Sequence, residues 1–178
     1  MLNGASVVKS RSKTVVVCDA GPLIHLHEVG CLHLLADFQK VIVPHGAENE
    51  VVRYRRINFA ENDIAWLLVP ARLPLERSIN TICTLFALDS GEVEAISILT
   101  HEPDALFLTD DAAARIVAGK LGYQVHGTIG ILVRAIRRDL LEPEEVIETL
   151  ERIRYKSTLH IKESLLQEMI STIKENTG

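Results

Sequence analysis

The sequence contains few aromatic residues, few cysteines and no long apolar run. Phe, Trp and Tyr make up only 4% of the 178 residues, so base stacking on aromatic rings is not expected as a main mode of nucleic-acid recognition. The three cysteines, Cys18, Cys31 and Cys83, are odd in number and irregularly spaced, which favours reduced thiols and a cytoplasmic location. No apolar run approaches the ~18 residues of a membrane span, so we expect no membrane insertion. The first residues carry no apolar core of about 7 to 15 residues, so we expect no secretory signal.

Positive charge is also scarce, and several common enzyme motifs are missing. Lys and Arg number 19 against 24 Asp and Glu, which gives a net charge of -5, so any binding to nucleic acid must be local. The chain has neither a Gly-x-Ser-x-Gly elbow nor a phosphate-binding Gly-x4-Gly-Lys loop, which removes common hydrolase and nucleotide-triphosphatase readings. The cysteine and histidines of residues 25–33 lack the spacing of a closed zinc site.

Short apolar runs alternate with longer helical patterns along most of the chain. Continuous apolar strands joined by helices are typical of a parallel sheet covered on both faces, so the sequence predicts an α/β fold. We expect a flexible tail over residues 1–13 and a single domain over 14–178. The predicted strands are Val15–Cys18, Val41–Val43, Leu67–Val69, Leu106–Thr109 and Gln124–His126.

The part of the chain after Pro143 has a different character. The segments EEVIETLERI and IKESLLQEMISTI are amphipathic with a helical period and contain no further strand. We therefore expect extra C-terminal helices that wrap the sheet or pack on a partner. No catalytic role is assigned to them.

Acidic residues stand directly after two of the predicted strands. Asp19 follows the run TVVVC, and Asp110 and Asp111 follow LFLT. Ligands of open parallel sheets bind outside the carboxyl ends of the strands, where the strand order reverses. If the first and fourth strands are neighbours there, their carboxylates converge on one crevice.

Two helices supply further acidic candidates. Glu50 lies on the helix after the second strand, and Glu94 lies in LDSGEVEAISIL. In that segment Asp89 and Glu92 fit a capping box, which gives Glu92 a sufficient structural role. Glu94 is about 200° around the helix from Glu92, and it forms a narrow polar stripe with Ser97 and His101 that points either to solvent or to a polar cleft. The other acids favour the cleft.

Each acid also has a simpler explanation when it is taken alone. Asp19, Asp110 and Asp111 can each cap the helix that follows them, and Glu50 can be a solvated helix residue. Their joint occurrence favours a shared metal site, because clustered carboxylates repel one another unless a cation neutralises them. Oxygen ligands favour Mg²⁺ or Mn²⁺, which support phosphodiester hydrolysis.

The chain resembles the PIN-domain family, particularly its toxin-like branch. The resemblance covers about residues 15–170 and is carried by an ordered series of segments: CDAGPLIHL, VIVPHGAENEVV, LDSGEVEAI and LTDDAAARIVAGKLGYQVHGTIGILVRA. It implies a three-layer fold with strand order 3-2-1-4-5, dependence on Mg²⁺ or Mn²⁺, and cleavage of single-stranded RNA. It also implies a toxin held inactive by an antitoxin protein, and we expect a homodimer.

The resemblance also implies which residues form the site, position by position. The implied catalytic residues are Asp19, Glu50, Glu94, Asp110 and Asp111, of which all but Glu50 are implied metal ligands. Glu94 matches a position that is Asp in many relatives. For the last acid, Asp111 fits the commoner Thr-x-Asp pattern, whereas Asp110 is nearest the strand end.

Arginines provide the candidate contacts with a nucleic-acid substrate. Arg115 lies one helical turn after Asp111 and is predicted to bind substrate phosphate or an acid. Arg134, Arg137 and Arg138 fall at helical spacing on one face, which is slightly more typical of a solvated charged face than of a specific RNA contact.

Two other functions remain compatible with the sequence. An aspartyl-phosphate phosphatase of the haloacid-dehalogenase type also combines a strand-end Asp with a later Asp-Asp pair. That group expects a second acid two residues after the first, where this chain has Gly21. The other alternative is a non-catalytic PIN-like module that binds a partner or nucleic acid.

Overall fold

The computed structural model of the chain describes residues 12–55, 57–59, 63–70 and 73–177. Most of the predicted flexible tail, residues 1–11, lies outside this range. The three cysteines are free and buried. Among the described residues, no helix combines the length and the apolar character needed to cross a membrane.

The centre of the fold is a five-stranded parallel sheet of order β3-β2-β1-β4-β5. This α/β architecture and its strand order confirm the predicted fold, and every predicted strand is present within two residues at either end. The strands are β1 Val15–Cys18, β2 Lys40–Pro44, β3 Trp66–Val69, β4 Leu106–Leu108 and β5 Val125–His126.

Helices connect the strands and complete the chain. They are α1 Ala20–Glu28, the 3-10 helix η1 Leu32–Asp37, α2 His45–Arg55, α3 Arg77–Leu85, α4 Ser90–Leu99, α5 Ala112–Lys120, α6 Thr128–Arg137, α7 Pro143–Lys156 and α8 Glu163–Thr177. The pattern of the sequence does not predict η1 or α3. In α3 only Cys83 is buried.

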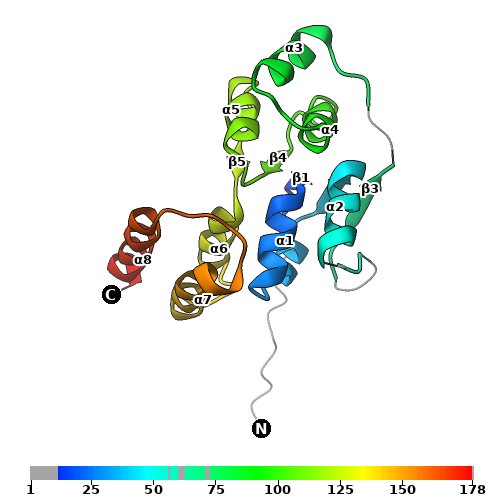
Figure 1. The fold of residues 1–178 in the computed structure, drawn as a ribbon. Coiled ribbons are helices and arrows are strands. Elements are labelled where there is room, and N and C mark those ends of the chain that lie inside the picture. The colour runs from blue at the N-terminus through cyan, green and yellow to red at the C-terminus, as the bar shows by residue number, and fades with distance from the viewer. Residues whose placement is uncertain (1–11, 56, 60–62, 71–72, 178) are drawn as a thin grey trace.

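The sheet separates two apolar layers, because successive strand residues point to opposite faces. Val16 and Cys18 of β1 belong to an apolar cluster that includes residues of α1, α6, α7 and α8, whereas Val17 belongs to a second cluster that includes residues of α4 and α5. Figure 1 shows α3, α4 and α5 on one side of the strands and α1, α6 and α7 on the other. Burial on both faces explains why the strands read as continuous apolar runs.

The predicted C-terminal helices begin at Pro143 and are attached to the body of the protein. Helix α7 starts with a capping box between Glu142 and Glu145, and its buried face packs into the layer that contains α1 and α6. The turn after α7 is tied to the end of α1, because the carboxylate of Glu28 accepts hydrogen bonds from Ser157 Oγ and Thr158 N at 2.9 and 2.7 Å.

Helices α2 and α4 approach each other closely at a pair of glycines. A Cβ atom on Gly46 would lie 2.8 Å from the Cα of Gly91, so only glycine fits between these backbones. The Gly46 amide also donates a 2.7 Å hydrogen bond to Glu94 Oε2. This contact sets the position of α4 relative to the first turn of α2.

The close approach predicts that Gly46→Ala destabilises the fold. The added methyl group must separate α2 from α4, so we expect a loss of about 1–3 kcal/mol in the free energy of unfolding, measured by urea denaturation. Gly119→Ala in α5 is the matched control, because its Cβ would meet nothing within 4 Å. Alanine is the better helix former by up to about 1 kcal/mol, so this control should be neutral or stabilising. Equal losses in the two variants would contradict the packing argument.

Candidate active site

The pairing of β1 with β4 brings the two acidic strand ends together, as predicted. Cys18 is in register with Leu108, and the Asp19 amide continues the ladder by donating a 2.9 Å hydrogen bond to the Leu108 carbonyl. Asp19 therefore stands beside the segment that starts at Thr109. Because β2 and β4 lie on opposite sides of β1, this is also the point where the strand order reverses.

Thr109 links the acids of the two strands. Its side chain is fully buried, and its hydroxyl donates a 3.1 Å hydrogen bond to Asp19 Oδ2. The same hydroxyl oxygen accepts a 3.1 Å hydrogen bond from the Asp111 amide. One side chain thus positions both the Asp19 carboxylate and the backbone that carries Asp111.

Asp19 occupies the N-cap position of α1, but its side chain makes no capping hydrogen bond. One reason is that Pro22, the third helical residue, has no amide to donate. Burial raises the pKa of the Asp19 carboxyl from 3.8 to about 6; hydrogen bonds from Ala20 and Thr109 oppose this rise, and the charges of Asp89 and Glu50 add to it. The capping explanation therefore does not account for this side chain.

Asp111 does cap the following helix, but with only one of its oxygens. Its Oδ1 accepts a 2.8 Å hydrogen bond from Ala114 N at the start of α5. The side chain is exposed, and its second oxygen accepts no hydrogen bond from the described residues. Capping and ligand binding are thus compatible at this residue.

Glu92 is a further acid near Asp19 and Asp111, although its sequence context indicates only a helix cap. The predicted capping box is present: Glu92 N donates to Asp89 Oδ1, and Asp89 N donates to Glu92 Oε2, both at 2.9 Å. Burial raises the pKa of Glu92 from 4.5 to about 7; the hydrogen bond from Asp89 opposes the rise, and the charges of Asp111, Asp89 and Asp19 reinforce it. Asp89 and Glu92 are the functional candidates that the sequence reasoning missed. The available signal was that a capping box uses only one oxygen of each carboxylate.

Glu50 lies at the edge of this group. Its side chain is exposed on α2, and its pKa is raised by burial and by the charge of Asp89, while His25 acts in the opposite direction. The described structure therefore brings together an acidic cluster, defined as Asp19, Glu50, Asp89, Glu92 and Asp111.

Glu94 has a different partner. Its carboxylate accepts the hydrogen bond from the Gly46 amide at the first turn of α2, where the helix dipole favours a negative charge. The other two residues of its predicted polar stripe differ: Ser97 is buried and donates to the Glu94 carbonyl, whereas His101 is exposed, with its ring 2.8 Å from the Ser97 carbonyl. The charges that raise the pKa values of Asp19, Glu50 and Glu92 do not include Glu94.

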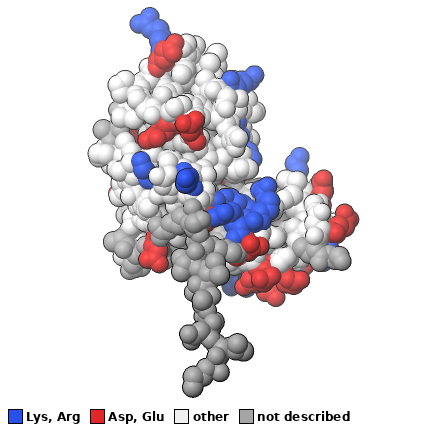
Figure 2. All heavy atoms as spheres, turned by 180° about the vertical axis from the view of Figure 1, so that it is seen from behind, with Lys and Arg blue, Asp and Glu red and all other residues white. Residues whose placement is uncertain are grey.

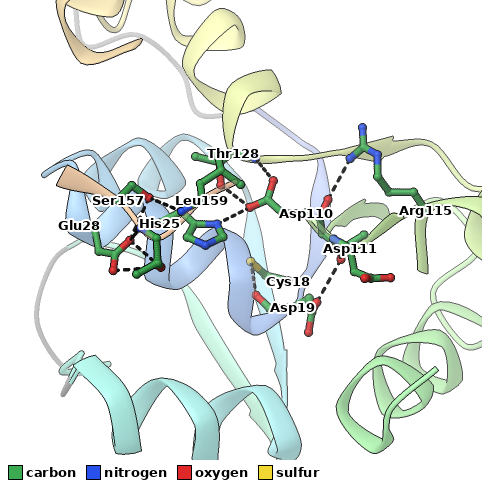
Figure 3. Close-up of polar contacts among 12 residues, drawn as sticks. Cys18, Asp19, His25, Glu28, Asp110, Asp111, Arg115, Thr128, Ser157 and Leu159 are labelled. Atoms are coloured by element: carbon green, nitrogen blue, oxygen red, sulfur yellow. Dashed lines mark hydrogen bonds and ion pairs between the residues drawn. The ribbon is translucent and has the colours of Figure 1, made fainter. Parts of the chain in front are cut away.

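Asp110 points away from Asp111 and is held on the other side of the strand end (Figure 3). Its Oδ2 lies 2.7 Å from His25 Nδ1 and accepts a 2.6 Å hydrogen bond from Thr128 Oγ1, while its Oδ1 accepts one from Thr128 N. Burial by itself would raise the pKa of Asp110, but these hydrogen bonds outweigh it and hold the pKa below its ordinary value. Nothing local in the sequence could pair His25 with a residue 85 positions away.

Arg115 lies between the strand end and a small hollow. Its side chain is exposed, and its Nη1 donates a 2.9 Å hydrogen bond to the Thr109 carbonyl. The hollow has a volume of about 260 Å³, and its walls include Asp110, Arg115, His126 and Leu159. The predicted substrate-binding residue thus stands next to the acidic strand end.

The chain was compared with known families, curated proteins and solved structures. A family model for the PIN domain matches residues 15–175. The chain belongs to the PIN-domain family. Neither the curated proteins nor the solved structures gave a match. PIN domains are typically nucleases that use divalent metal ions, so family membership points to nuclease-type chemistry on nucleic acid.

The acidic cluster of this PIN domain fits a divalent cation by its chemistry. Carboxylate oxygens are the ligands that Mg²⁺ and Mn²⁺ prefer. Burial is the main cause of the raised pKa values of Asp19 and Glu92, neighbouring carboxylates add to it, and a bound cation would favour the charged forms of both side chains. Among the described residues, no three Asp, Glu, His or Cys side chains are already arranged closely enough to hold an ion. Binding therefore requires these side chains to close around the metal.

The raised pKa of Asp19 predicts a pH-dependent destabilisation of the metal-free protein. Because the folded-state pKa is about 6 against 3.8 ordinarily, the folded protein holds a proton that the unfolded chain releases, so stability falls as pH rises from about 4 to 7. Asp19→Asn should remove this penalty. We expect the variant to be more stable than the wild type at pH 8 in chelator, by up to about 3 kcal/mol, in urea unfolding across a pH series.

The exposed Asp104 provides the control for this measurement, since Asp104→Asn removes the same charge outside the acidic cluster. The difference in free energy of unfolding between the wild type and Asp19→Asn should change between pH 5 and pH 8. A constant difference would contradict the raised pKa of Asp19.

Proposed function

We propose that this PIN domain is an Mg²⁺- or Mn²⁺-dependent endoribonuclease that hydrolyses phosphodiester bonds of single-stranded RNA. The observation that carries the proposal is the acidic cluster, in which the charges of Asp111, Asp89 and Asp19 act on Glu92 beside the carboxyl ends of β1 and β4. Burial, and to a smaller extent neighbouring carboxylates, raises the pKa values of Asp19 and Glu92, and a hard divalent cation would favour their charged forms.

Asp19, Glu92 and Asp111 would hold the ion, with Asp89 and Glu50 at the rim of the site. When bound, the ion supplies Lewis acidity to a phosphate oxygen and lowers the pKa of water. Thr109 keeps Asp19 and Asp111 in place through its two hydrogen bonds. Arg115, exposed beside the strand end, is proposed to bind a substrate phosphate.

This proposal adds Glu92 to the sequence-based set of metal ligands and leaves out two residues of that set. Glu94 and Asp110 were predicted as metal ligands, and that prediction stays open to test. Their observed partners support positioning roles instead: Glu94 holds the first turn of α2, and Asp110 joins β4 to α1 and α6 through His25 and Thr128.

A non-catalytic binding module is the second candidate. It is favoured by the finding that no three possible ligands among the described residues are closely grouped. The phosphatase alternative has no comparable support, since Gly21 still stands where its second acid is expected and the family is that of PIN domains.

The role of a toxin in a type II toxin–antitoxin pair, together with a homodimeric state, is the biological setting that we propose. It rests on the sequence resemblance to toxin-like PIN domains. Expression of the chain alone should arrest growth, and co-expression with the product of an adjacent small gene should relieve the arrest.

The metal-site proposal predicts different effects for two glutamates on α4. Asp19→Asn and Glu92→Gln should each lower the rate of Mg²⁺- or Mn²⁺-dependent cleavage of single-stranded RNA by at least about 100-fold, because each removes a charged ligand. Glu94→Gln keeps an oxygen that can accept the Gly46 hydrogen bond, so its cleavage rate should fall by less than about tenfold. The reverse order of Glu92 and Glu94 would support the sequence-based ligand set.

Metal binding separates the nuclease from the binding module. Calorimetric titration of Mn²⁺ should give saturable binding to the wild type that is lost in Asp19→Asn and Glu92→Gln and retained in Glu94→Gln. Saturable binding should also raise the Tm of the wild type. Wild-type protein that binds RNA without saturable Mn²⁺ binding or cleavage would establish the module instead.

A further inference from the structure

A second, larger hollow lies at the opposite end of the sheet from the acidic cluster. Its volume is about 630 Å³, and its walls include Thr14, which precedes β1, and Leu106, which begins β4. It is therefore at the amino ends of the central strands, whereas the acids are at their carboxyl ends. Arg134, Arg137 and Arg138 of α6 and its C-cap form its charged wall.

Two of these arginines are held in fixed positions by a buried carboxylate. Asp37 is 8% exposed, and its Oδ2 forms an ion pair with Arg134 Nη2 at 2.6 Å. Its two oxygens also accept hydrogen bonds from Arg138 Nε and Nη2, both at 3.0 Å. Burial would raise the pKa of Asp37, but the two arginines hold it below its ordinary value. The Arg134 guanidinium also stacks 4.2 Å from the Phe38 ring centroid. Asp37 therefore fixes the position of both guanidinium groups, and the charge of Asp139 also acts on Arg138.

Arg137 adds a further charge that no described residue neutralises. Its side chain is exposed, and it forms no ion pair with the described part of the chain. The hollow also includes Asp104, so its charge is not uniformly positive. Three of the 19 Lys and Arg residues of the chain nevertheless line this one wall. Seen from behind, a group of Lys and Arg side chains lies beside the lobe of C-terminal helices, with Asp and Glu side chains next to it and on the lobe (Figure 2).

His126 connects this hollow with the active site. It lines both the large hollow and the small hollow that contains Asp110 and Arg115. Its pKa is lowered by burial and by the charges of Arg137, Arg115 and Arg134, so cations from both hollows act on the same ring. His126 belongs to β5, the outermost strand on this side of the sheet.

We propose that a basic belt, formed by Arg115, Arg134, Arg137 and Arg138 with the His126 ring between them, binds the phosphodiester backbone of the RNA strand that extends from the acidic cluster. The strand would leave the acids at Arg115, pass the β5 edge at His126 and enter the large hollow. This inference rests on the proposed function. Backbone contacts suit the low aromatic content of the chain, because phosphate neutralisation by arginine needs neither base stacking nor a particular sequence.

The belt predicts that RNA affinity depends on strand length and on Arg137. Binding is measured by fluorescence anisotropy in the Asp19→Asn background with chelator, using strands of about 4 to about 16 nucleotides, the usual range of single-strand site sizes. For long strands, Arg137→Ala should weaken binding about three- to tenfold. It should also reduce the slope of log K against log salt by about 0.7, the value for one phosphate contact. For the shortest strands the loss should be less than twofold.

Charge variants and a distant arginine provide the controls. Arg137→Lys should retain most of the affinity for long strands, and Arg137→Glu should lose more than Arg137→Ala. Arg77→Ala on α3 removes an equally exposed arginine that lines neither hollow, and should leave binding unchanged. Equal losses for Arg77→Ala and Arg137→Ala would overturn the proposal, as would Arg137-dependent binding of a mononucleotide without any gain from strand length.

The belt and the nuclease can fail separately. Length-dependent binding that needs Arg137, in a protein whose wild type does not cleave RNA, would support the belt and contradict the nuclease. Metal-dependent cleavage with affinity for long strands that is independent of Arg137 would support the nuclease and overturn the belt.

Discussion

The parallel pairing of β1 with β4 is the constraint on which the acidic cluster depends. The register that places Cys18 beside Leu108 also places Asp19 beside Thr109, and the buried Thr109 hydroxyl then holds both acidic strand ends. The two apolar layers on either face of the sheet keep this register, because a slip of one residue would turn Val16 and Val17 to the wrong faces. The chemistry of the site thus follows from the packing of a few short strands.

Neighbouring acids at this edge differ because of their partners. Asp110 has three hydrogen bonds from His25 and Thr128, which lower its pKa despite burial. Burial raises the pKa of Asp19, its hydrogen bonds from Ala20 and Thr109 do not outweigh this effect, and the charges of Asp89 and Glu50 add to it. Asp110 therefore contributes to the rigidity of the strand end, whereas a cation near Asp19 would favour its charged form. The same residue type performs structural and chemical roles within one short segment.

The charges of the fold are divided between the two ends of the sheet. The acidic cluster lies at the carboxyl ends of the strands, and the arginines of α6 lie around the amino ends, fixed by Asp37. The β5 edge, with His126, joins them. A net charge of -5 conceals this arrangement, because the average over the surface says nothing about where the arginines gather.

The sequence by itself determined the strands, most helices, the capping box of Asp89 and Glu92, and the presence of acids at two strand ends. Continuous apolar runs and caps are local signals, so they could be read without coordinates. Only the tertiary structure decided which acids act together. Glu92 and Glu94 are two helical positions apart, and the apolar period of the helix does not show which of them faces β1. In the structure Glu94 accepts a hydrogen bond from the Gly46 amide, whereas the charges of Asp19 and Asp111 act on Glu92. The separation of Asp110 from Asp111 likewise depended on His25, a partner that only folding brings into contact.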